Sequence, residues 1–153
     1  MIMPRIHVRT NEFISKDKKY SMLKEFKEVV DTIPWEIEEH LMADFEGECA
    51  MLYGEDAELP VATVEFNILE KVYLKVDDAI LERALFNVTA IVSNTLKIKP
   101  NRIFAFFRPI PMWAWEGINI EKTIIKIDEE PEHKEQPGEY IDGNYKHLRC
   151  GFL

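Results

Sequence analysis

Pro4 is the residue whose type and position most directly suggest chemistry, because it directly follows a methionine near the start of the chain. A proline at the first position of a protein has a free secondary amine, which can act as a general base. With Met1, Ile2 and Met3 in place, the same nitrogen is part of an amide without basicity. Pro4 is then an ordinary first residue of a strand, where a missing ladder donor costs little.

The sequence leaves both interpretations of Pro4 open. Initiator methionine is normally removed only before a small residue or proline, so Ile2 would preserve Met1. Translation from Met3 would instead expose Pro4. The mature N-terminal residue therefore decides between them.

Other residue types that often carry chemistry form no recognisable motif. There is no CxxC or HExxH, and the four histidines have no metal-ligand spacing, so we expect no metal site. Cys49 and Cys150 are typical of two free thiols, although a disulfide between them stays open. Glu36, Glu38 and Glu39 resemble a solvated face more than a catalytic group.

Composition indicates one domain of 153 residues with a genuine core. The 28 acidic and 19 basic residues give a net charge of -9, which argues against a nucleic-acid or anionic-membrane partner. The chain has no apolar run of about 18 residues and no signal-peptide hydrophobic region. We therefore expect a soluble, cytoplasmic protein.

The first half predicts a strand, a helix and a second extended region. Residues 5–9 alternate Ile6 and Val8 with polar side chains, the period of a half-buried strand. Ser15 is a candidate N-cap for a helix over 15–33 that ends at a proline. Residues 37–43 form the second extended region.

The second half repeats this order. Residues 60–68 predict a strand with Val64, Phe66 and Ile68 on one face, so that Glu65 and Asn67 point outward and are expected to be exposed. A helix over 76–96 follows, with an acidic N-terminus. Residues 102–108 are almost continuously apolar, which favours a strand buried on both sides.

Two pseudo-repeated βαβ units thus predict an α+β fold: one four-stranded mixed sheet with both helices on the same face. The uncovered face would be apolar, and such domains usually bury it by oligomerisation. We predict one domain over 1–120. Residues 121–153 form a C-terminal extension with an extra strand at 122–127, a charged loop and a hairpin around Asp142-Gly143.

These features resemble the tautomerase superfamily, with its migration inhibitory factor-like fold, over about residues 3–120. The resemblance rests on two segments, residues 4–11 (PRIHVRTN) and 96–103 (LKIKPNRI), and on the order of the elements. Residues 59–66, 107–110 and 115–117 look closer to an uncharacterised bacterial branch of the superfamily.

The resemblance implies a homotrimer that binds small carboxylates and catalyses keto–enol tautomerisation or isomerisation of α-keto or enol acids without a cofactor. Pro4 falls on the catalytic proline and Ile68 on a residue whose backbone amide binds substrate. Phe104 and Phe106 fall on positions that are polar in migration inhibitory factor. Most of the polar substrate-holding set is therefore missing, and the available cations are Arg5, Arg9 and Arg108. The alternative is a catalytically inactive trimer that serves as a binding or structural protein.

Two tryptophans near the end of the last predicted strand admit two interpretations. Trp113 and Trp115 have side chains that can stack on a ligand. Aromatic clusters at the ends of strands more often form contacts between subunits, so we predict an intersubunit contact.

Overall fold

A four-stranded mixed sheet is the centre of the fold. The computed structural model describes residues 4–34 and 40–120. The strands are β1 (Arg5–Thr10), β2 (Met42–Glu46), β3 (Ala62–Leu69) and β4 (Ile103–Ile110), in the order β2-β1-β3-β4. β1 is parallel to β2 and β3 to β4, whereas β1 and β3 are antiparallel. The two predicted βαβ units are therefore joined through their first strands.

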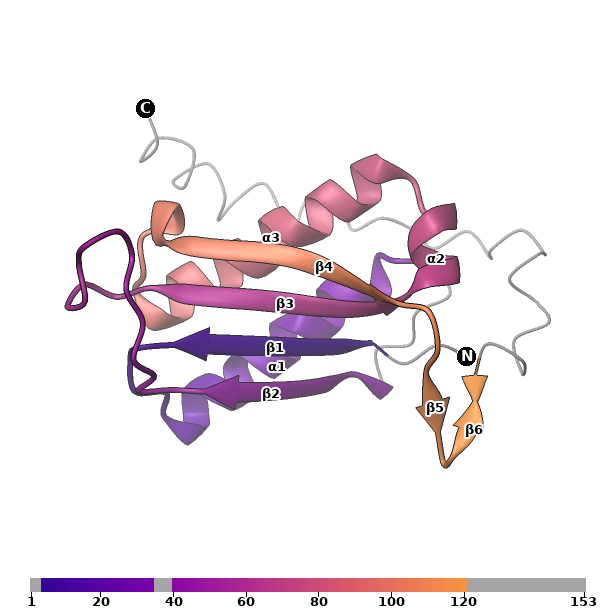
Figure 1. Ribbon diagram of the computed structural model, residues 1–153, viewed down its shortest axis with the longest axis horizontal. Coiled ribbons are helices and arrows are strands. Elements are labelled where there is room, and N and C mark those ends of the chain that lie inside the picture. Colours follow the sequence, from indigo (N-terminus) through magenta and orange to yellow (C-terminus); the bar gives the residue numbers. More distant parts are fainter. Residues whose placement is uncertain (1–3, 35–39, 121–153) are drawn as a thin grey trace.

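Two long helices, α1 (Lys16–Asp31) and α3 (Asp78–Leu96), cover one face of this sheet (Figure 1). The Ser15 hydroxyl caps α1 by accepting a hydrogen bond from the Lys18 amide, and the Asp77 carboxylate caps α3 through the Ala79 amide. Lys97 ends α3 in the left-handed conformation, with a φ of 58°. The predicted α+β fold with both helices on one face is confirmed.

Several smaller elements complete the described chain. A short helix, α2 (Glu70–Lys75), follows β3, and a 3-10 turn, η2 (Pro100–Arg102), precedes β4. A hairpin of β5 (Ala114–Trp115) and β6 (Ile118–Asn119) extends beyond the end of the sheet where β1 begins (Figure 1). The proline at residue 100 predicts a turn where η2 lies, whereas α2, β5 and β6 were not predicted, because each is too short to show a hydrophobic period.

The hydrophobic core lies between the sheet and the two long helices. Its fully buried members come from both repeats, with Ile6 on β1, Phe26 on α1 and Phe66 on β3 among the largest. Phe66 also contacts Phe107 of β4, with 5.0 Å between the ring centroids. Each strand thus contributes every second side chain to one core.

The second strand of the first repeat lies later in the chain than predicted. It was expected over residues 37–43, but β2 spans Met42–Glu46 and forms the edge beside β1. Residues 35–39 lie outside the described residues. The apolar Ile37 and Leu41 suggested the earlier position, whereas pairing with Arg5–Arg9 selects the segment with alternating charges.

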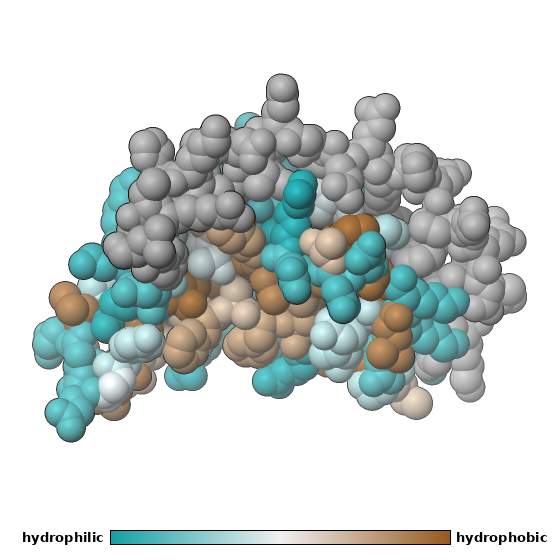
Figure 2. All heavy atoms as spheres, turned by 90° about the horizontal axis from the view of Figure 1, so that it is seen from above, coloured by the Kyte–Doolittle hydropathy of each residue, from teal (hydrophilic) through white to brown (hydrophobic). Residues whose placement is uncertain are grey.

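The prediction that residues 102–108 are buried on both sides is wrong for the described chain. β4 lies at an edge of the sheet, and the outward side chains of Phe104 and Phe106 are 60% and 37% exposed. Figure 2 shows the molecule from above, which is the side of the β4 edge. Apolar surface lies in the middle of this view, between hydrophilic areas. A continuous apolar run in the sequence shows only that the side chains are apolar. It does not show whether the uncovered face of the sheet is buried as well as the face under the helices.

The predicted extra strand, charged loop and C-terminal hairpin fall within 121–153, outside the described residues, and the division at residue 120 stays a prediction. Among the described residues, no helix is long and apolar enough to cross a membrane.

Substitution of Phe66 by alanine tests the shared core. We expect Phe66→Ala to lower the free energy of unfolding by about 3–5 kcal/mol, because it removes a fully buried ring. Urea denaturation measures this change. The matched variant Phe13→Ala removes an exposed ring and should cost less than about 1 kcal/mol. Equal losses for the two variants would contradict the described core.

Candidate active site

Pro4 lies at the end of the sheet where β1 and β2 begin. It is buried, and its carbonyl oxygen accepts a hydrogen bond of 3.1 Å from the amide of Met42, the first residue of β2. β3 and β4 end on the same side, since β3 is antiparallel to β1 and parallel to β4. Pro4 is therefore held where four strand ends and the β5–β6 hairpin meet.

A cavity of about 320 Å³ opens at this end of the sheet. Its lining residues are Arg5, Asn67, Ile110, Met112, Trp113 and Ala114. Arg5 is the residue after Pro4, and Asn67 is its partner on β3. The segment from β4 into β5 supplies the apolar wall, which a bond of 2.9 Å from the Ile120 amide to the Trp113 carbonyl holds in place. The cavity thus has a polar wall on the sheet and an apolar wall on the segment that follows it.

Arg5 is held on both sides by neighbouring strands. Its Nε and Nη2 atoms donate to the two carboxylate oxygens of Asp44 on β2, at 2.7 and 3.0 Å. Its Nη1 atom donates to Oδ1 of Asn67 on β3, at 2.9 Å. The bidentate geometry of Arg5 and Asp44 is the strong form of an arginine–carboxylate pair.

Arg9 and His7 continue the polar row along β1. His7 bonds Asp44 through Nδ1, and its Nε2 lies 3.3 Å from a carboxylate oxygen of Glu46. The Arg9 Nε atom lies 3.7 Å from the same Glu46 oxygen. A hydrogen bond to Cys49 and the charge of Glu46 both raise the pKa of Arg9. Arg9 therefore stays cationic and has an acidic partner.

Arg108 on β4 has an acidic partner as well. Its Nη2 atom lies 3.3 Å from Oε2 of Glu65. The Oε1 atom of Glu65 accepts a hydrogen bond of 2.8 Å from the side-chain Nδ2 of Asn67. Together with Arg5 and Asp44, these side chains form a polar chain across all four strands. The interaction partners run from β2 through β1 and β3 to β4.

Two predictions about this face need correction. Glu65 and Asn67 were expected to be exposed, but the Glu65 side chain is only 16% exposed and Asn67 only 4%, because the Asn67 side-chain amide lies between Arg5 and Glu65. The uncovered face was expected to be apolar, but charged and amide side chains occupy most of β1, β2 and β3, and apolar side chains gather on β4. The alternation of side chains between the two faces of the sheet was predicted correctly. The pairing of charges between strands was not, because it depends on the register of the strands.

The predicted site residues are only partly brought together. Arg5 lines the cavity, and Arg108 lies beside it in register with Asn67. Arg9, Phe104 and Phe106 lie on the same face but further toward the other end of the sheet. The Ile68 side chain is fully buried on the helix side. Only its backbone amide can serve a site, which is the role that the resemblance implies.

Asp44 and Asn67 are site residues that were not predicted from the sequence. Asp44 sits in a segment that alternates charged and apolar residues, and this pattern complements the alternating cations of β1. That signal was available. Trp113 was expected at an intersubunit contact, which stays a prediction, and it also lines the cavity. Among the described residues, no group of three or more metal-binding side chains could hold a metal ion.

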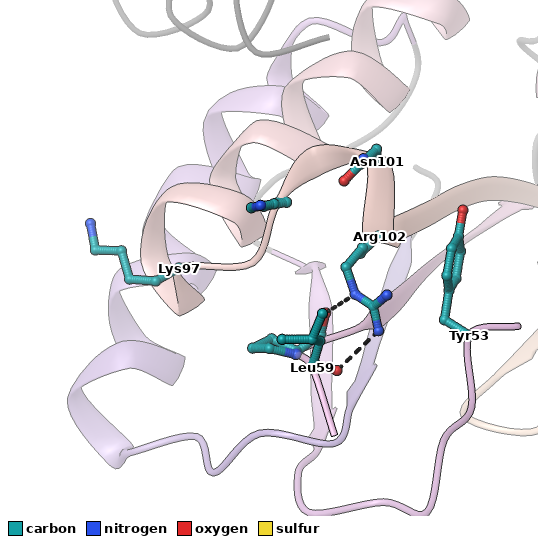
Figure 3. A pocket seen from close by; sticks show the side chains of 7 residues that line it. Tyr53, Leu59, Lys97, Asn101 and Arg102 are labelled. Carbon is teal, nitrogen blue, oxygen red and sulfur yellow. Dashed lines mark hydrogen bonds between the residues drawn. The ribbon is translucent and has the colours of Figure 1, made fainter. Parts of the chain in front are cut away.

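A second cavity, of about 340 Å³, lies at the opposite end of the sheet (Figure 3). There, Arg102 donates from Nε to the carbonyl of Pro60 at 2.7 Å and from Nη2 to the carbonyl of Leu59 at 3.1 Å. Its guanidinium lies 4.8 Å from the centre of the Tyr53 ring. The ammonium group of Lys97 points away from Arg102 (Figure 3). Arg102 thus fastens the loop after β2 to the start of β4, which is a structural role.

Asp56 completes this fastening and makes it sensitive to acid. Its Oδ2 lies 2.9 Å from Nη2 of Arg102. A hydrogen bond from the Glu58 amide, assisted by the Leu59 amide and by Arg102, lowers the pKa of Asp56 below its usual value. A lowered pKa stabilises the fold above the ordinary carboxyl pKa, and this contribution is lost as the pH falls through the lowered value.

The variant Asp56→Asn tests this coupling. We expect it to lower the melting temperature at pH 7, because the charged partner of Arg102 is lost. The difference from the parent protein should shrink as the pH falls below the ordinary carboxyl pKa and through the lowered value, where the parent carboxylate also takes up its proton. Thermal unfolding across this range measures the effect. A difference that is the same at pH 7 and pH 2 would contradict the assigned role.

No protein-family model and no curated protein sequence matches the chain. Solved structures do match. MIF2 of Leishmania major superposes with a TM-score of 0.68 at 14% identity, over 76% of this chain and 97% of that protein. The migration inhibitory factor homologue of Prochlorococcus marinus has a TM-score of 0.64 at 20% identity, over 75% and 97%.

A fused 4-OT protein, described as a wild-type asymmetric trimer, is a third neighbour. Its TM-score is 0.64 at 13% identity, over 78% of this chain and 98% of that protein. Identities this low show a shared fold alone. The described chain therefore has the fold of migration inhibitory factor and 4-OT.

Proposed function

We propose that the chain is a member of the tautomerase superfamily and that it interconverts the keto and enol forms of small carbonyl compounds, with Pro4 as the base. The observation that carries this proposal is the position of Pro4. It is buried at the start of β1, directly before a residue that lines a cavity. The shared fold and the segment 4–11 support the same assignment.

The proposed reaction needs only a base and hydrogen-bond donors. The nitrogen of an N-terminal Pro4 takes the proton from the carbon next to the carbonyl. The electron pair of that C–H bond forms the C=C bond of the enol, and the carbonyl π electrons move to oxygen. The oxygen takes a proton from water, and protonated Pro4 returns its proton to solvent, so that the enzyme is unchanged. An amine in apolar surroundings has a lowered pKa, because the loss of hydration disfavours its charged form, so it is neutral and basic near neutral pH.

Arg5 is suited to hold the carbonyl oxygen in this reaction. A guanidinium has five N–H groups, and the bonds to Asp44 and Asn67 use three of them. The two that remain can donate to the oxygen on which negative charge develops. Such positioned donors are usually worth more than any other single contribution to catalysis.

The test compares two forms of the protein: one that begins at Pro4 and one that retains Met1, Ile2 and Met3. Enolisation of phenylpyruvate and of its methyl ester, followed by ultraviolet absorbance, should occur only in the form with a free Pro4 amine. In that form, Pro4→Ala should lower kcat/KM by about 10²–10⁴, the usual contribution of a general base. The mass of the protein from its native source shows which form exists.

Thr63→Ser is the matched control, because Thr63 lies on the same sheet face at the far end from the cavity. It should leave the rate unchanged. Equal activity in Pro4→Ala and in the parent protein would overturn the role of Pro4.

A second candidate function is a catalytically inactive trimer that serves as a binding or structural protein. Two observations favour it: each predicted substrate-binding arginine has an acidic partner, and Phe104 and Phe106 are apolar. If the form with a free Pro4 amine enolises neither substrate and still forms a trimer, as judged by sedimentation, this function replaces the first.

We also propose a homotrimeric assembly and a place in the bacterial branch of the superfamily. The fused 4-OT neighbour is described as a trimer, and the β4 edge exposes two phenylalanines that assembly would bury. A cytoplasmic location stays a prediction from the sequence.

A further inference from the structure

The balance of charge around the cavity carries one inference about its ligand. The lining combines four apolar residues, Ile110, Met112, Trp113 and Ala114, with Asn67 and Arg5. Arg5 is the single charged side chain among these described lining residues. Whether the cavity favours an anion therefore depends on how much of the Arg5 charge is already compensated.

The charge of Arg5 is compensated by Asp44. Both carboxylate oxygens of Asp44 accept from the guanidinium, at 2.7 and 3.0 Å, and each side chain of the pair is 36% exposed. Asn67 takes a further N–H group without adding charge. Arg5 consequently offers the cavity hydrogen-bond donors but little net positive charge.

The nearby arginines on this face are compensated in the same way. Arg108 lies against Glu65, and Arg9 lies against Glu46. The third carboxylate, Asp44, is shared by Arg5 and His7, and His7 faces Glu46 through its other nitrogen. The three arginines on this face of the described chain are thus matched by three carboxylates.

This arrangement distinguishes a neutral ligand from an anionic one. A carboxylate that enters the cavity loses hydration, which costs free energy. Because the positive charge of Arg5 is already paired, its attraction for the carboxylate offsets little of that cost. A neutral carbonyl group loses less hydration and needs only donors, which the remaining N–H groups of Arg5 supply. The apolar wall favours a hydrophobic or aromatic body.

We infer that this cavity binds neutral aromatic or apolar carbonyl compounds, such as ketones, esters or amides, in preference to carboxylate anions, and that Asp44 sets this preference. The inference rests on the site of the proposed function and specifies its substrate class.

The test measures binding of a matched pair of unreactive ligands, cinnamamide and cinnamate, by isothermal titration calorimetry at pH 7.5. The two ligands have the same planar aromatic body and differ in charge. Asp44→Asn removes the negative charge while its amide oxygen can still accept from Arg5. Glu46→Gln is the matched control, because Glu46 lies on the same strand and face but contacts His7 and Arg9 instead of Arg5.

The parent protein should bind cinnamamide at least as tightly as cinnamate. Asp44→Asn should raise the affinity for cinnamate relative to cinnamamide by about tenfold, since it uncovers a cation close to the ligand. Glu46→Gln should change this ratio by less than about threefold, because it lies further away and its charge is screened. Circular dichroism and melting temperature check that both variants fold.

The double variant Arg5→Gln, Asp44→Asn supplies an independent measurement should Asp44→Asn alone fail to fold, because it leaves neither charge of the pair unpaired. It should weaken both ligands by a similar factor, because it removes the donors of Arg5 and no net charge. Four results would each overturn the inference: a preference of the parent protein for cinnamate, an unchanged ratio in Asp44→Asn, a loss confined to cinnamate in the double variant, and no binding of either ligand.

Turnover is measured separately from binding. Preference for cinnamamide without enolisation of phenylpyruvate or its ester would refute the proposed tautomerase activity and leave the binding inference standing. Enolisation together with a preference for cinnamate would support the proposed tautomerase activity and refute the binding inference.

Discussion

The antiparallel pairing of β1 with β3 is the contact on which the rest of the structure depends. Each βαβ unit buries one face of two strands under its helix, but two strands alone are too narrow a base for a core. Pairing of the two first strands produces one sheet and brings Phe26 and Phe66 of different repeats into one core. The same pairing sets Arg5 opposite Asn67, so the register that completes the core also builds the polar wall of the cavity.

The two faces of this sheet follow different physical rules. On the helix side, apolar side chains from every strand are removed from water, which supplies most of the stabilising free energy. On the other side, half-buried charges can persist only if they are paired, and each strand supplies the partner of a charge on its neighbour. Asp44 compensates Arg5, Glu46 lies near Arg9 and Glu65 lies near Arg108. The second face is therefore largely polar, and the register of the strands determines which opposite charges are paired on it.

Much of the fold could be predicted because its signals are local and periodic. The alternation of residues 5–9, the cap Ser15, the acidic start of α3 and the long apolar stripes of the helices each act within a few residues. The position of β2 could not be predicted in this way, because residues 37–43 and 42–46 are both compatible with a strand and only pairing with β1 selects the second. The hairpin after β4 was missed because two-residue strands have no measurable period.

For the candidate site, the type and order of the groups can be read from the amino-acid sequence: a proline before a strand, cations on alternate positions and phenylalanines where a related site would be polar. Tertiary structure alone decided which of these groups meet. It placed Asp44 beside Arg5, buried Asn67 between Arg5 and Glu65, and brought Trp113 to the cavity. Charge compensation depends on distances of a few ångströms between side chains on strands that are far apart in the chain. Those distances follow from the register, which no single segment contains.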